Sequence, residues 1–471
     1  MVCFLWGDAV TSQPVTVVRG GHVLTMGPAG DLAGGAVAFR AGEILAVGPF
    51  DEVAGQFPDA EVVGDTWGVV LPGLVNCHTH LSEALVPGMG EDMTLFEWCT
   101  RIVGPVGRHL TREMARVGTM LKGAELLLSG VTCVNDMFCH ANLDAQASLG
   151  VVDGLEAMGL RGVASFGPED AFDPYPVAAF LEEHEALAER CAKTGLIGFR
   201  LGIGTLLGQT DDLLTASVRA ARDHGWAVHT HLAEVREELV QARLRWGRTT
   251  VEQAVDVGLL DLPVLAAHCV WVSEADIGVL AEAGVAAVHN PVANMILGSG
   301  VCPVPALRRA GIPVGLGTDG AASNDSQNML EVPKAAALLQ KVARLDPRAL
   351  LAGDVLAMAT VEGASALGLD GLVGSLEPGR RADLVRLGGD GPGLANVHDP
   401  AQQVVYCASP ADVADVWVDG HRRVAGGRLV SHDLAALVRA SRPLAEELAT
   451  RAGLGALSRL ARTPGPGPAG P

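Results

Sequence analysis

The sequence lacks any run of about 18 uncharged apolar residues, the length that a membrane-spanning helix needs. This absence predicts a protein without transmembrane helices. The first residues also lack the basic and apolar segments of a secretory signal, so we expect a cytoplasmic protein. The nine cysteines are odd in number and include no Cys-x-x-Cys pair, which favours reduced thiols over a disulfide framework.

Basic residues are scarce beside acidic ones. The chain has 34 Lys and Arg against 54 Asp and Glu, a formal net charge of -20. A charge of this sign repels polyanions, so we expect neither nucleic acid nor an anionic membrane surface as a partner. The composition leaves assembly into a homo-oligomer open. A length of 471 residues exceeds one typical domain but is short of three.

Two histidines one residue apart follow an apolar segment that begins at Val69. Side chains two positions apart in a strand point to the same face, so His78 and His80 can approach one metal ion. An H-x-H pair alone is a weak signal because chance produces it often. Its weight comes from the positions of later histidines and of one aspartate.

Four later apolar segments with the length of strands also end in a polar residue. These residues are His231, His268, His289 and Asp319. Amphipathic stretches with helical spacing lie between the segments, and this alternation indicates a parallel β/α architecture. In a closed barrel the strand ends gather at the face where active sites lie. Any one of these histidines alone fits a hydrogen-bonded structural residue, but the succession favours a metal site.

The pattern predicts an α/β fold, a (β/α)8 barrel of the TIM type with a small β-sandwich domain formed by both chain ends. The barrel strands are expected near residues 69–77, 131–136, 160–166, 196–203, 227–232, 264–269, 285–290 and 313–319. The predicted domains are the N-terminal part of the β domain (1–68), the metal-dependent barrel (69–370), the C-terminal part of the β domain (371–437), a C-terminal helix (438–462) and a disordered tail rich in Pro and Gly (463–471). The long first connection, from Leu81 to about Leu110, is expected to shape the substrate pocket.

The side chains at the strand ends predict a metal site with a base beside it. The candidate ligands are His78, His80, His231 and Asp319. Three nitrogens and one carboxylate suit zinc, with Fe(II) and Mn(II) as alternatives. Zinc makes water a nucleophile near neutral pH, and such a water needs a base. Glu234 is a candidate base, although a solvated charge in a run of charged residues explains it equally well.

Two further histidines are candidates near the metal site. His268 is well placed to hydrogen-bond the water or to stabilise developing negative charge. His289 is expected either close to the ligands and the substrate or holding Asn290 and Asn294 in their loop. Glu234, His268 and Asp319 are therefore the catalytic candidates.

Six segments carry a resemblance to a known family. They are residues 72–80 (PGLVNCHTH), 229–234 (HTHLAE), 267–270 (AHCV), 289–294 (HNPVAN), 317–324 (GTDGAASN) and 374–384 (GSLEPGRRADL). The chain resembles the deaminase and chlorohydrolase branch of the amidohydrolase superfamily. Within that branch it is similar to the 5-methylthioadenosine/S-adenosylhomocysteine deaminases and to the triazine hydrolases. The resemblance extends from the early β segments to about Leu437.

The resemblance implies a ligand set and a role for each catalytic candidate. It implies one zinc ion held by His78, His80, His231 and Asp319. It also implies that Glu234 shuttles a proton from the water to a ring nitrogen, that Asp319 passes a proton to the leaving amine and that His268 orients the water. Relatives with two metals bridge them with a carboxylated Lys on the fourth strand, but residues 196–203 contain no Lys. One metal ion per chain is therefore expected.

The sequence departs from the nucleoside deaminases of this branch where they hold the nucleoside. Shortly after a Trp in the first long loop, those enzymes carry a Glu that grips the ribose hydroxyls. Here the Trp is Trp98, but Gly107 stands at the Glu position, and Gly204 replaces a His just after the fourth strand. Arg161 is a candidate counterpart of one pocket arginine, and a second is not evident. The expected substrate contacts are Trp98, Glu234, Arg161 and His289.

These residues indicate a metal-dependent hydrolytic deaminase. It would remove an exocyclic amino group from a nitrogen heterocycle, a purine-like base or a nucleoside derivative, which is the expected small-molecule partner. The alternative is a hydrolase of the same chemistry that displaces halide or alkylamine from an aromatic heterocycle, as triazine hydrolases do. A barrel retained as a non-catalytic binding scaffold is disfavoured, because every predicted ligand and Glu234 are present.

Overall fold

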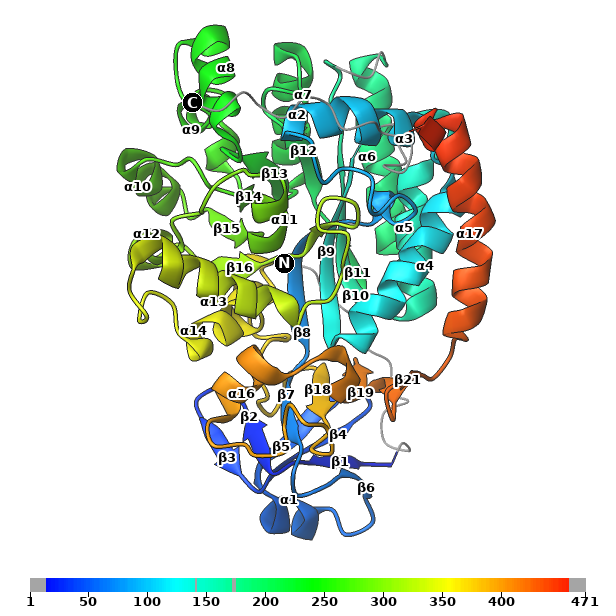
Figure 1. Ribbon diagram of the computed structural model, residues 1–471, viewed down its shortest axis with the longest axis vertical. Helices are drawn as coiled ribbons and strands as arrows, with labels where there is room; N and C mark the ends of the chain where they lie inside the picture. Colours follow the sequence, from blue (N-terminus) through cyan, green and yellow to red (C-terminus); the bar gives the residue numbers. More distant parts are fainter. Residues whose placement is uncertain (1–13, 140–141, 172–174, 457–471) are drawn as a thin grey trace.

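A ring of parallel strands stands above a smaller β domain (Figure 1). The computed structural model describes residues 14–139, 142–171 and 175–456. The barrel strands are β8 (Leu74–His80), β9 (Val131–Cys139), β10 (Arg161–Gly167), β11 (Ile197–Phe199) with β12 (Leu201–Thr205), β13 (Val228–Leu232), β14 (Val264–His268), β15 (Ala286–His289) and β16 (Val314–Leu316) with β17 (Asp319–Gly320). Neighbouring strands of the ring pair in parallel. The predicted (β/α)8 barrel is confirmed.

Broken strands occupy two positions of the ring. At the fourth position, β11 pairs with β10 whereas β12 pairs with β13. The chain changes neighbours at Arg200, whose amide donates to the Ala164 carbonyl. At the eighth position, β16 pairs with β15 and β17 pairs with β8, so Asp319 lies opposite Thr79. The second break therefore places Asp319 beside the histidines that end β8.

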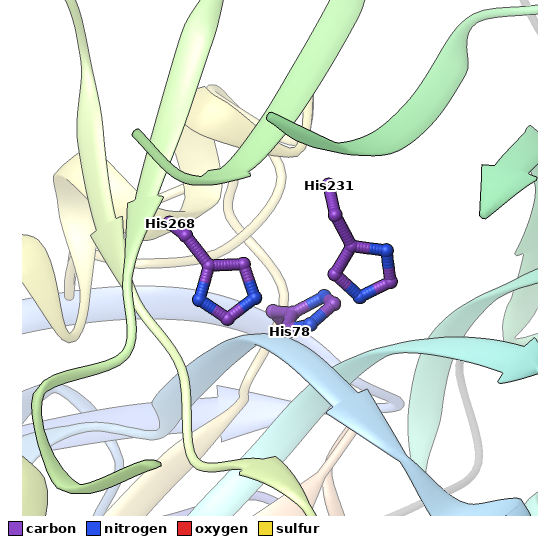
Figure 2. A group of neighbouring side chains, drawn as sticks. All are labelled: His78, His231 and His268. Atoms are coloured by element: carbon purple, nitrogen blue, oxygen red, sulfur yellow. The ribbon is translucent and has the colours of Figure 1, made fainter. Parts of the chain in front are cut away.

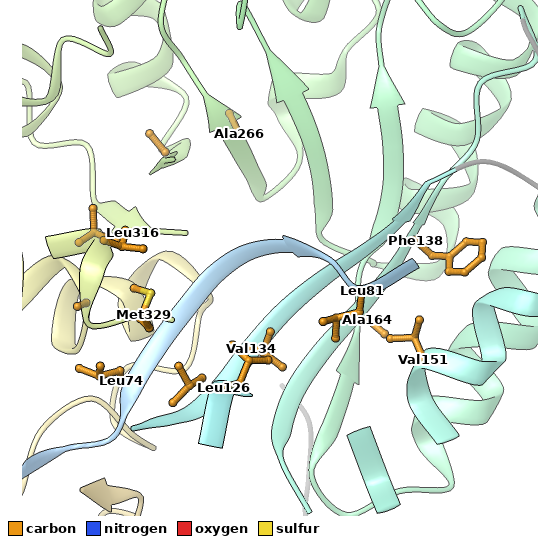
Figure 3. Close-up of a cluster of buried hydrophobic side chains, with 14 of the residues drawn as sticks. Leu74, Leu81, Leu126, Val134, Phe138, Val151, Ala164, Ala266, Leu316 and Met329 are labelled. Atoms are coloured by element: carbon orange, nitrogen blue, oxygen red, sulfur yellow. The ribbon is translucent and has the colours of Figure 1, made fainter. Parts of the chain in front are cut away.

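Helices cover the outside of the ring. They include α4 (Arg112–Leu128), α5 (Ala147–Met158), α6 (Val177–Ala192), α7 (Asp211–His224), α8 (Arg236–Trp246), α9 (Thr250–Asp256), α10 (Glu274–Glu282), α11 (Pro291–Ile296), α12 (Val304–Arg309), α13 (Glu331–Arg344), α14 (Ala352–Met358) and α15 (Val361–Ala366). Leu126 of α4 and Val151 of α5 join Val134 and Phe138 of β9 in one buried core (Figure 3). This continuous apolar layer between helices and strands holds the strand ends in place.

Helix α7 illustrates how the sequence sets the bounds of such a helix. The Thr210 hydroxyl accepts a hydrogen bond from the Leu213 amide, which caps the first turn. Gly225, with φ of +68°, ends the helix in the left-handed conformation that glycine adopts without a steric penalty. The buried side chains recur at helical spacing and form one face: Leu213, Leu214, Ser217, Val218 and Ala221.

Two sheets made from both ends of the chain form the small domain. Their strand orders are β5-β4-β1-β6 and β21-β20-β19-β18-β7-β2-β3. The bounds are β1 (Thr16–Arg19), β2 (His22–Leu24), β3 (Asp31–Ala33), β4 (Gly35–Arg40), β5 (Glu43–Pro49), β6 (Glu61–Gly64), β7 (Val69–Pro72), β18 (Leu384–Leu387), β19 (Val413–Val418), β20 (His421–Ala425) and β21 (Arg428–Leu429), with helices α1 (Phe50–Gln56) and α16 (Pro400–Cys407). Val18 and Phe39 of the first sheet pack with Val70 and Trp417 of the second. The two sheets therefore form the expected sandwich.

The barrel begins after Gly73, so the prediction of one strand over residues 69–77 is wrong at its start. Val69–Pro72 pairs with β2 and β18 in the small domain, and Leu74–His80 is the first barrel strand. The Gly73 amide donates to the Asp383 carbonyl. A Cβ at residue 73 would lie 2.1 Å from the Thr132 hydroxyl oxygen. Glycine therefore lets the chain pass between the two domains.

A long helix near the C-terminus packs along the barrel. Helix α17 (Leu434–Arg451) lies beside α4 (Figure 1). It begins earlier than predicted because Asp433 caps it through the Ala435 amide, and it ends at Arg451, just before Gly453 at φ of +70°. The last predicted helical residues and the predicted tail, 463–471, lie outside the described residues. Across the part of the chain that the structure describes, no helix has the length and apolar character to cross a bilayer.

A buried ion-pair cluster joins the barrel to the small domain. Arg161, at the start of β10, donates from Nε and Nη2 to the Asp383 carboxylate, both at 2.9 Å. Nη2 also lies 2.9 Å from Asp419, which in turn pairs with Arg381. This position is at the opposite end of the strand from the predicted metal site. The expectation that Arg161 contacts substrate is therefore wrong, because its charge is used by carboxylates at the domain junction.

Replacing Arg161 with Met should leave Asp383 buried without its partner. We expect the free energy of unfolding to fall by about 3–5 kcal/mol, the usual cost of breaking a buried pair from one side. Arg222→Met is the matched control, because the Arg222–Asp261 pair is 52% and 74% exposed and such pairs contribute about 1 kcal/mol or less. Urea denaturation measures both variants. If both variants lost an equally small amount of unfolding free energy, the stability of the domain junction would not depend on Arg161.

Candidate active site

Four predicted side chains converge at the carboxyl ends of the barrel strands. His78 and His80 come from β8, His231 from β13 and Asp319 from β17. Asp319 Oδ1 lies 3.5 Å from Nε2 of both His78 and His80. The Nε2 atoms of His80 and His231 are 3.0 Å apart. Ligand atoms about 2.0–2.1 Å from one tetrahedral ion lie roughly 3.3 Å from each other, so this spacing fits a shared metal ion.

The hydrogen bonds of two histidines fix where their lone pairs point. Nδ1 of His80 lies 2.6 Å from the Met137 carbonyl, and Nδ1 of His231 lies 2.6 Å from the Gly204 carbonyl. A carbonyl can only accept, so each Nδ1 carries the proton. Burial, with the neighbouring histidines, lowers the pKa of His231 well below its ordinary value. With the proton on Nδ1, an uncharged ring has its lone pair on Nε2, so the two rings can direct lone pairs at one point, an arrangement that suits a cation between them.

The third imidazole is oriented by a histidine that the sequence analysis did not single out. Nδ1 of His78 lies 2.9 Å from Nε2 of His229, and Nδ1 of His229 lies 3.1 Å from the Ser165 hydroxyl. Nε2 of His78 is buried and has no hydrogen-bond partner among the described residues. Such an orphaned atom is what an absent metal ion would leave. The one signal for His229 was its place two residues before His231, on the same strand face.

Strained backbone aims several side chains at this point. Ala233, His268 and Asp319 have φ of 52°, 73° and 67°. Such values are uncommon for residues other than glycine, cost about 1–3 kcal/mol each and concentrate at functional sites. The left-handed turn at Ala233 redirects the chain directly after β13, so that the next residue, Glu234, turns into the barrel mouth.

Glu234 is buried, with 4% of its surface exposed, which excludes the interpretation as a solvated charge. Its Oε1 accepts a hydrogen bond from the Ser299 hydroxyl at 3.2 Å, and its Oε2 lies 3.4 Å from His268 Nε2. The Glu238 carboxylate holds the loop by accepting from the amides of Ala233 and Glu234. Burial raises the pKa of Glu234 well above its ordinary value, and the carboxylates of Asp319 and Glu238 add to the shift.

His268 faces the same point from β14 (Figure 2). The Asn294 amide nitrogen lies 2.9 Å from its Nδ1 and donates to it. The Nε2 proton of His268 is then directed toward Glu234 and toward Asp319 Oδ2, which lies at 3.7 Å. Burial lowers the pKa of His268 to about 3, so the ring stays neutral near pH 7. His268 can therefore donate one hydrogen bond at the centre of the site.

A competing ligand set includes Cys139. Its sulfur lies 3.4 Å from His80 Nδ1, and one ligand atom from each of His80, Cys139 and His231 falls within a 4.8 Å group. Burial raises the pKa of the Cys139 thiol well above its usual range. Because the thiolate is the form that binds metals, and because His80 Nδ1 already donates to a carbonyl, the His and Asp set is favoured.

The site opens into a cavity with an empty volume of about 500 Å³, open solvent at its mouth included. Its walls include His231, His268, Glu234 and Asp319 together with Trp98. Trp98 comes from α2 (Leu95–Trp98) in the long first connection, which continues through the π-helix Cys99–Val103 and α3 (Gly104–His109). The structure thus brings Trp98 to the cavity, as expected.

His289 does not reach the cavity. Its side chain is fully buried at the end of β15, and neither ring nitrogen has a hydrogen-bond partner among the described residues. Burial lowers its pKa to about 3. The expectation that His289 contacts substrate is therefore wrong. Asn294, which it was expected to hold in place, bonds to His268 instead.

Several further cavity residues escaped the sequence analysis, among them Glu83, Glu169 and Thr205. Glu83 lies in the 3-10 turn Leu81–Glu83 and accepts a hydrogen bond from the Ala322 amide at 3.2 Å. Glu169 follows β10, and Thr205 ends β12. The available signal was their position at a strand end or in the two or three residues after it.

The family model described as the amidohydrolase family matches residues 69–423, which is most of the chain. The chain belongs to the amidohydrolase family. A shorter match, over residues 35–60, is to the bacterial imidazolonepropionase-like composite domain.

Individual relatives of this amidohydrolase cover nearly its full length. It is 39% identical over 442 residues to the 5-methylthioadenosine/S-adenosylhomocysteine deaminase of Desulforudis audaxviator, covering 92% of this chain and 98% of the relative. A zinc-bound adenosine deaminase from Xanthomonas campestris has a TM-score of 0.86 at 30% identity, covering 92% and 98%. A zinc complex of the atrazine chlorohydrolase of Arthrobacter aurescens TC1 has a TM-score of 0.83 at 25% identity, covering 91% and 100%.

Elemental analysis of this amidohydrolase should find about one transition-metal ion per chain. His231→Ala and Asp319→Ala should each lose most of that metal, because each removes one of the four candidate ligands. His289→Gln is the matched control, a buried histidine that should keep its metal. Circular dichroism checks that each variant is folded. Full metal content in both folded ligand variants would contradict the assignment.

Proposed function

We propose that this amidohydrolase is a zinc-dependent deaminase that hydrolyses an exocyclic amino group from a nitrogen heterocycle, a purine-like base or a nucleoside derivative. The observation that carries the proposal is the shared cavity wall in which Glu234, His268 and Asp319 face the candidate metal ligands. Water activation, proton transfer and departure of an amine all need groups within one such space. The relatives named as deaminases support the same reaction.

The proposed ligands of the ion are His78, His80, His231 and Asp319. The bound ion would supply Lewis-acid chemistry that makes water a nucleophile near neutral pH. The bound zinc in the Xanthomonas campestris structure supports zinc over Fe(II) or Mn(II). The orphaned Nε2 of His78 and the facing lone pairs of His80 and His231 support one ion in this position.

Glu234 is the proposed proton shuttle. It would take a proton from the attacking water and give it to a ring nitrogen of the substrate. A raised pKa favours this role, because a general acid–base group works best when its pKa lies near the working pH. The Ser299 hydroxyl at Oε1 holds the carboxyl group in one orientation while Oε2 faces His268.

His268 and Asp319 complete the proposed proton path. With Nδ1 bonded to Asn294, His268 would use its Nε2 proton to orient the water and to stabilise developing negative charge. Asp319 Oδ2, 3.7 Å from His268 Nε2, would accept the second proton of the attacking water and pass it to the leaving amine. The Gly320 amide donates to Asp319 Oδ1 at 2.7 Å, which favours the ionised carboxylate before that step.

The cavity suits a planar heterocycle. Trp98 offers an aromatic face or edge in the wall. Gly107, at the position of the ribose-binding Glu, is buried within α3 and offers no carboxylate. We therefore propose a substrate that does not depend on a ribose diol.

Displacement of halide or alkylamine from an aromatic ring is the second candidate function. The atrazine chlorohydrolase structure, which covers 91% of this chain, favours it. The same ligands and the same Glu234 would serve both reactions, because only the leaving group differs. Measuring chloride release from a chlorotriazine beside ammonia release from amino-heterocycles separates the two.

Glu234→Gln should bind metal normally and lose activity by at least about 10²- to 10⁴-fold, the usual contribution of general acid–base catalysis. Glu237→Gln, an exposed neighbour, is the matched control and should retain full activity. Ammonia release and metal content are measured on both proteins. Near-normal turnover by Glu234→Gln would remove Glu234 from the mechanism.

Adenosine, methylthioadenosine and S-adenosylhomocysteine should be poor substrates. A charged partner for ribose hydroxyls contributes about 1.5–3 kcal/mol for each hydrogen bond, and Gly107 and Gly204 supply none. Steady-state assays should give kcat/KM below about 10⁴ M⁻¹s⁻¹ for all three, with the matching free bases as comparison. A higher value for any of the three would mean that another residue of the first loop, such as Glu91 or Asp92, binds the ribose.

A further inference from the structure

The loop that carries Ser299 holds both Glu234 and His268. The Ser299 hydroxyl donates to Glu234 Oε1 at 3.2 Å, and the Asn294 side chain donates to His268 Nδ1 at 2.9 Å. The Ser299 amide also donates to the Asn294 carbonyl at 2.9 Å. One short segment therefore fixes the orientation of two side chains that the proposed proton transfer uses.

Ser299 lies between two glycines, so its own backbone gives it little rigidity. Gly298 and Gly300 have φ of +63° and +126°. Glycine has more conformational freedom than any other residue, and that freedom must be lost when the loop is ordered. Ser299 is nevertheless buried, with 3% of its surface exposed. Contacts from outside the loop are therefore needed to keep its hydroxyl on Glu234.

Trp271, which follows β14 by three residues, supplies such a contact. Its indole Nε1 donates to the Ser299 carbonyl at 2.7 Å. Its main-chain amide donates at 2.8 Å to the carbonyl of Ala233, the residue directly before Glu234. The two bonds join the backbone at both ends of the Ser299–Glu234 hydrogen bond. A closed ring of contacts therefore runs through Trp271.

Neither substrate contact nor full burial accounts for Trp271. The cavity walls include neither Trp271 nor Ser299, although they include Glu234. Trp271 has 37% of its surface exposed, and a side chain that stays partly in water gains less from burial than a core side chain does. The indole N–H is thus the contact through which Trp271 can influence the site.

We propose that Trp271 is a positioning residue for proton transfer, which acts through Ser299 to hold the Glu234 carboxyl group in its reactive orientation. The inference rests on the proposed role of Glu234 and deepens it. Proton transfer requires heavy atoms about 2.6–3.2 Å apart, so a carboxyl group that rotates spends less time in the reactive geometry. Loss of the indole N–H should slow turnover without weakening metal or substrate binding.

Trp271→Phe keeps an aromatic ring and removes the N–H donor. Adenine, melamine and atrazine are the substrates, assayed by ammonia or chloride release, and the fastest is used for all variants. We expect kcat to fall about 5- to 10-fold, as for one lost hydrogen bond, while KM stays within about twofold. Trp67→Phe is the matched control in the small domain, where Trp67 has 70% of its surface exposed, and it should keep the natural kcat.

A double-mutant cycle shows whether Trp271 acts through Ser299. Ser299→Ala should lower kcat at least as much as Trp271→Phe does, whereas Ser299→Thr, which keeps the hydroxyl, should retain most of it. Adding Trp271→Phe to Ser299→Ala should cost less than about a further twofold, because residues that act through one contact are not additive. Multiplication of the two losses, loss of zinc from Trp271→Phe or a change confined to KM would each overturn the proposal.

Hydrogen exchange on the zinc-loaded protein gives a readout that does not depend on turnover. Peptides that cover residues 294–301 should exchange faster in Trp271→Phe than in the natural protein, and Trp67→Phe should leave them unchanged. Unchanged exchange in Trp271→Phe would overturn the proposal even if its activity fell. Failure of the proposed function has another signature: the zinc-loaded natural protein would release neither ammonia nor chloride from any heterocycle, while the exchange difference would remain.

Discussion

Two imidazole nitrogens, Nε2 of His80 and Nε2 of His231, lie 3.0 Å apart in this barrel. The contact between His80 and His231 is repulsive unless a cation lies between them. The backbone carbonyls of Met137 and Gly204 set this arrangement, because each accepts a hydrogen bond from the Nδ1–H group of one ring. The proposed metal site is therefore built into the positions of strand backbones, and the proposed roles of Glu234 and His268 depend on it.

The fold sustains this arrangement from both ends of the strands. At the carboxyl ends, the break between β16 and β17 lets Asp319 pair with β8 while its left-handed φ turns the carboxylate toward the histidines. At the amino ends, Arg161 forms ion pairs with Asp383 and Asp419 of the small domain. The barrel strands are thus fixed at their amino ends by an ion-pair cluster, and their carboxyl ends converge on the candidate metal site.

Much of the site could be predicted because it obeys a local rule. A residue that ends a parallel strand in a barrel faces the active side, and the two-residue period of a strand places His78 and His80 on one face. The same rule explains the error at Arg161. Arg161 begins a strand and so lies at the wrong end, where its partner Asp383 is 222 positions away in the chain. His289 ends a strand as expected, but its buried side chain does not line the cavity.

Other features depend on contacts that no local pattern contains. Glu169 occupies its place because Gly204 and Gly208 leave room and Thr205 holds it. The junction at Gly73 follows from its close approach to Thr132. The apolar run before His78 reads as one strand, but it divides between two domains because its first four residues pair with β2 and β18.

X-ray absorption on the zinc-loaded protein tests the central claim most directly, because it reports which atoms surround the ion. Ligation by His78, His80, His231 and Asp319 predicts a shell of nitrogen and oxygen at about 2.0–2.2 Å with no sulfur. The competing set that contains Cys139 predicts a zinc–sulfur distance of about 2.3 Å. A sulfur in the shell would contradict the account, since it would require His80 and its carbonyl partner to be arranged differently.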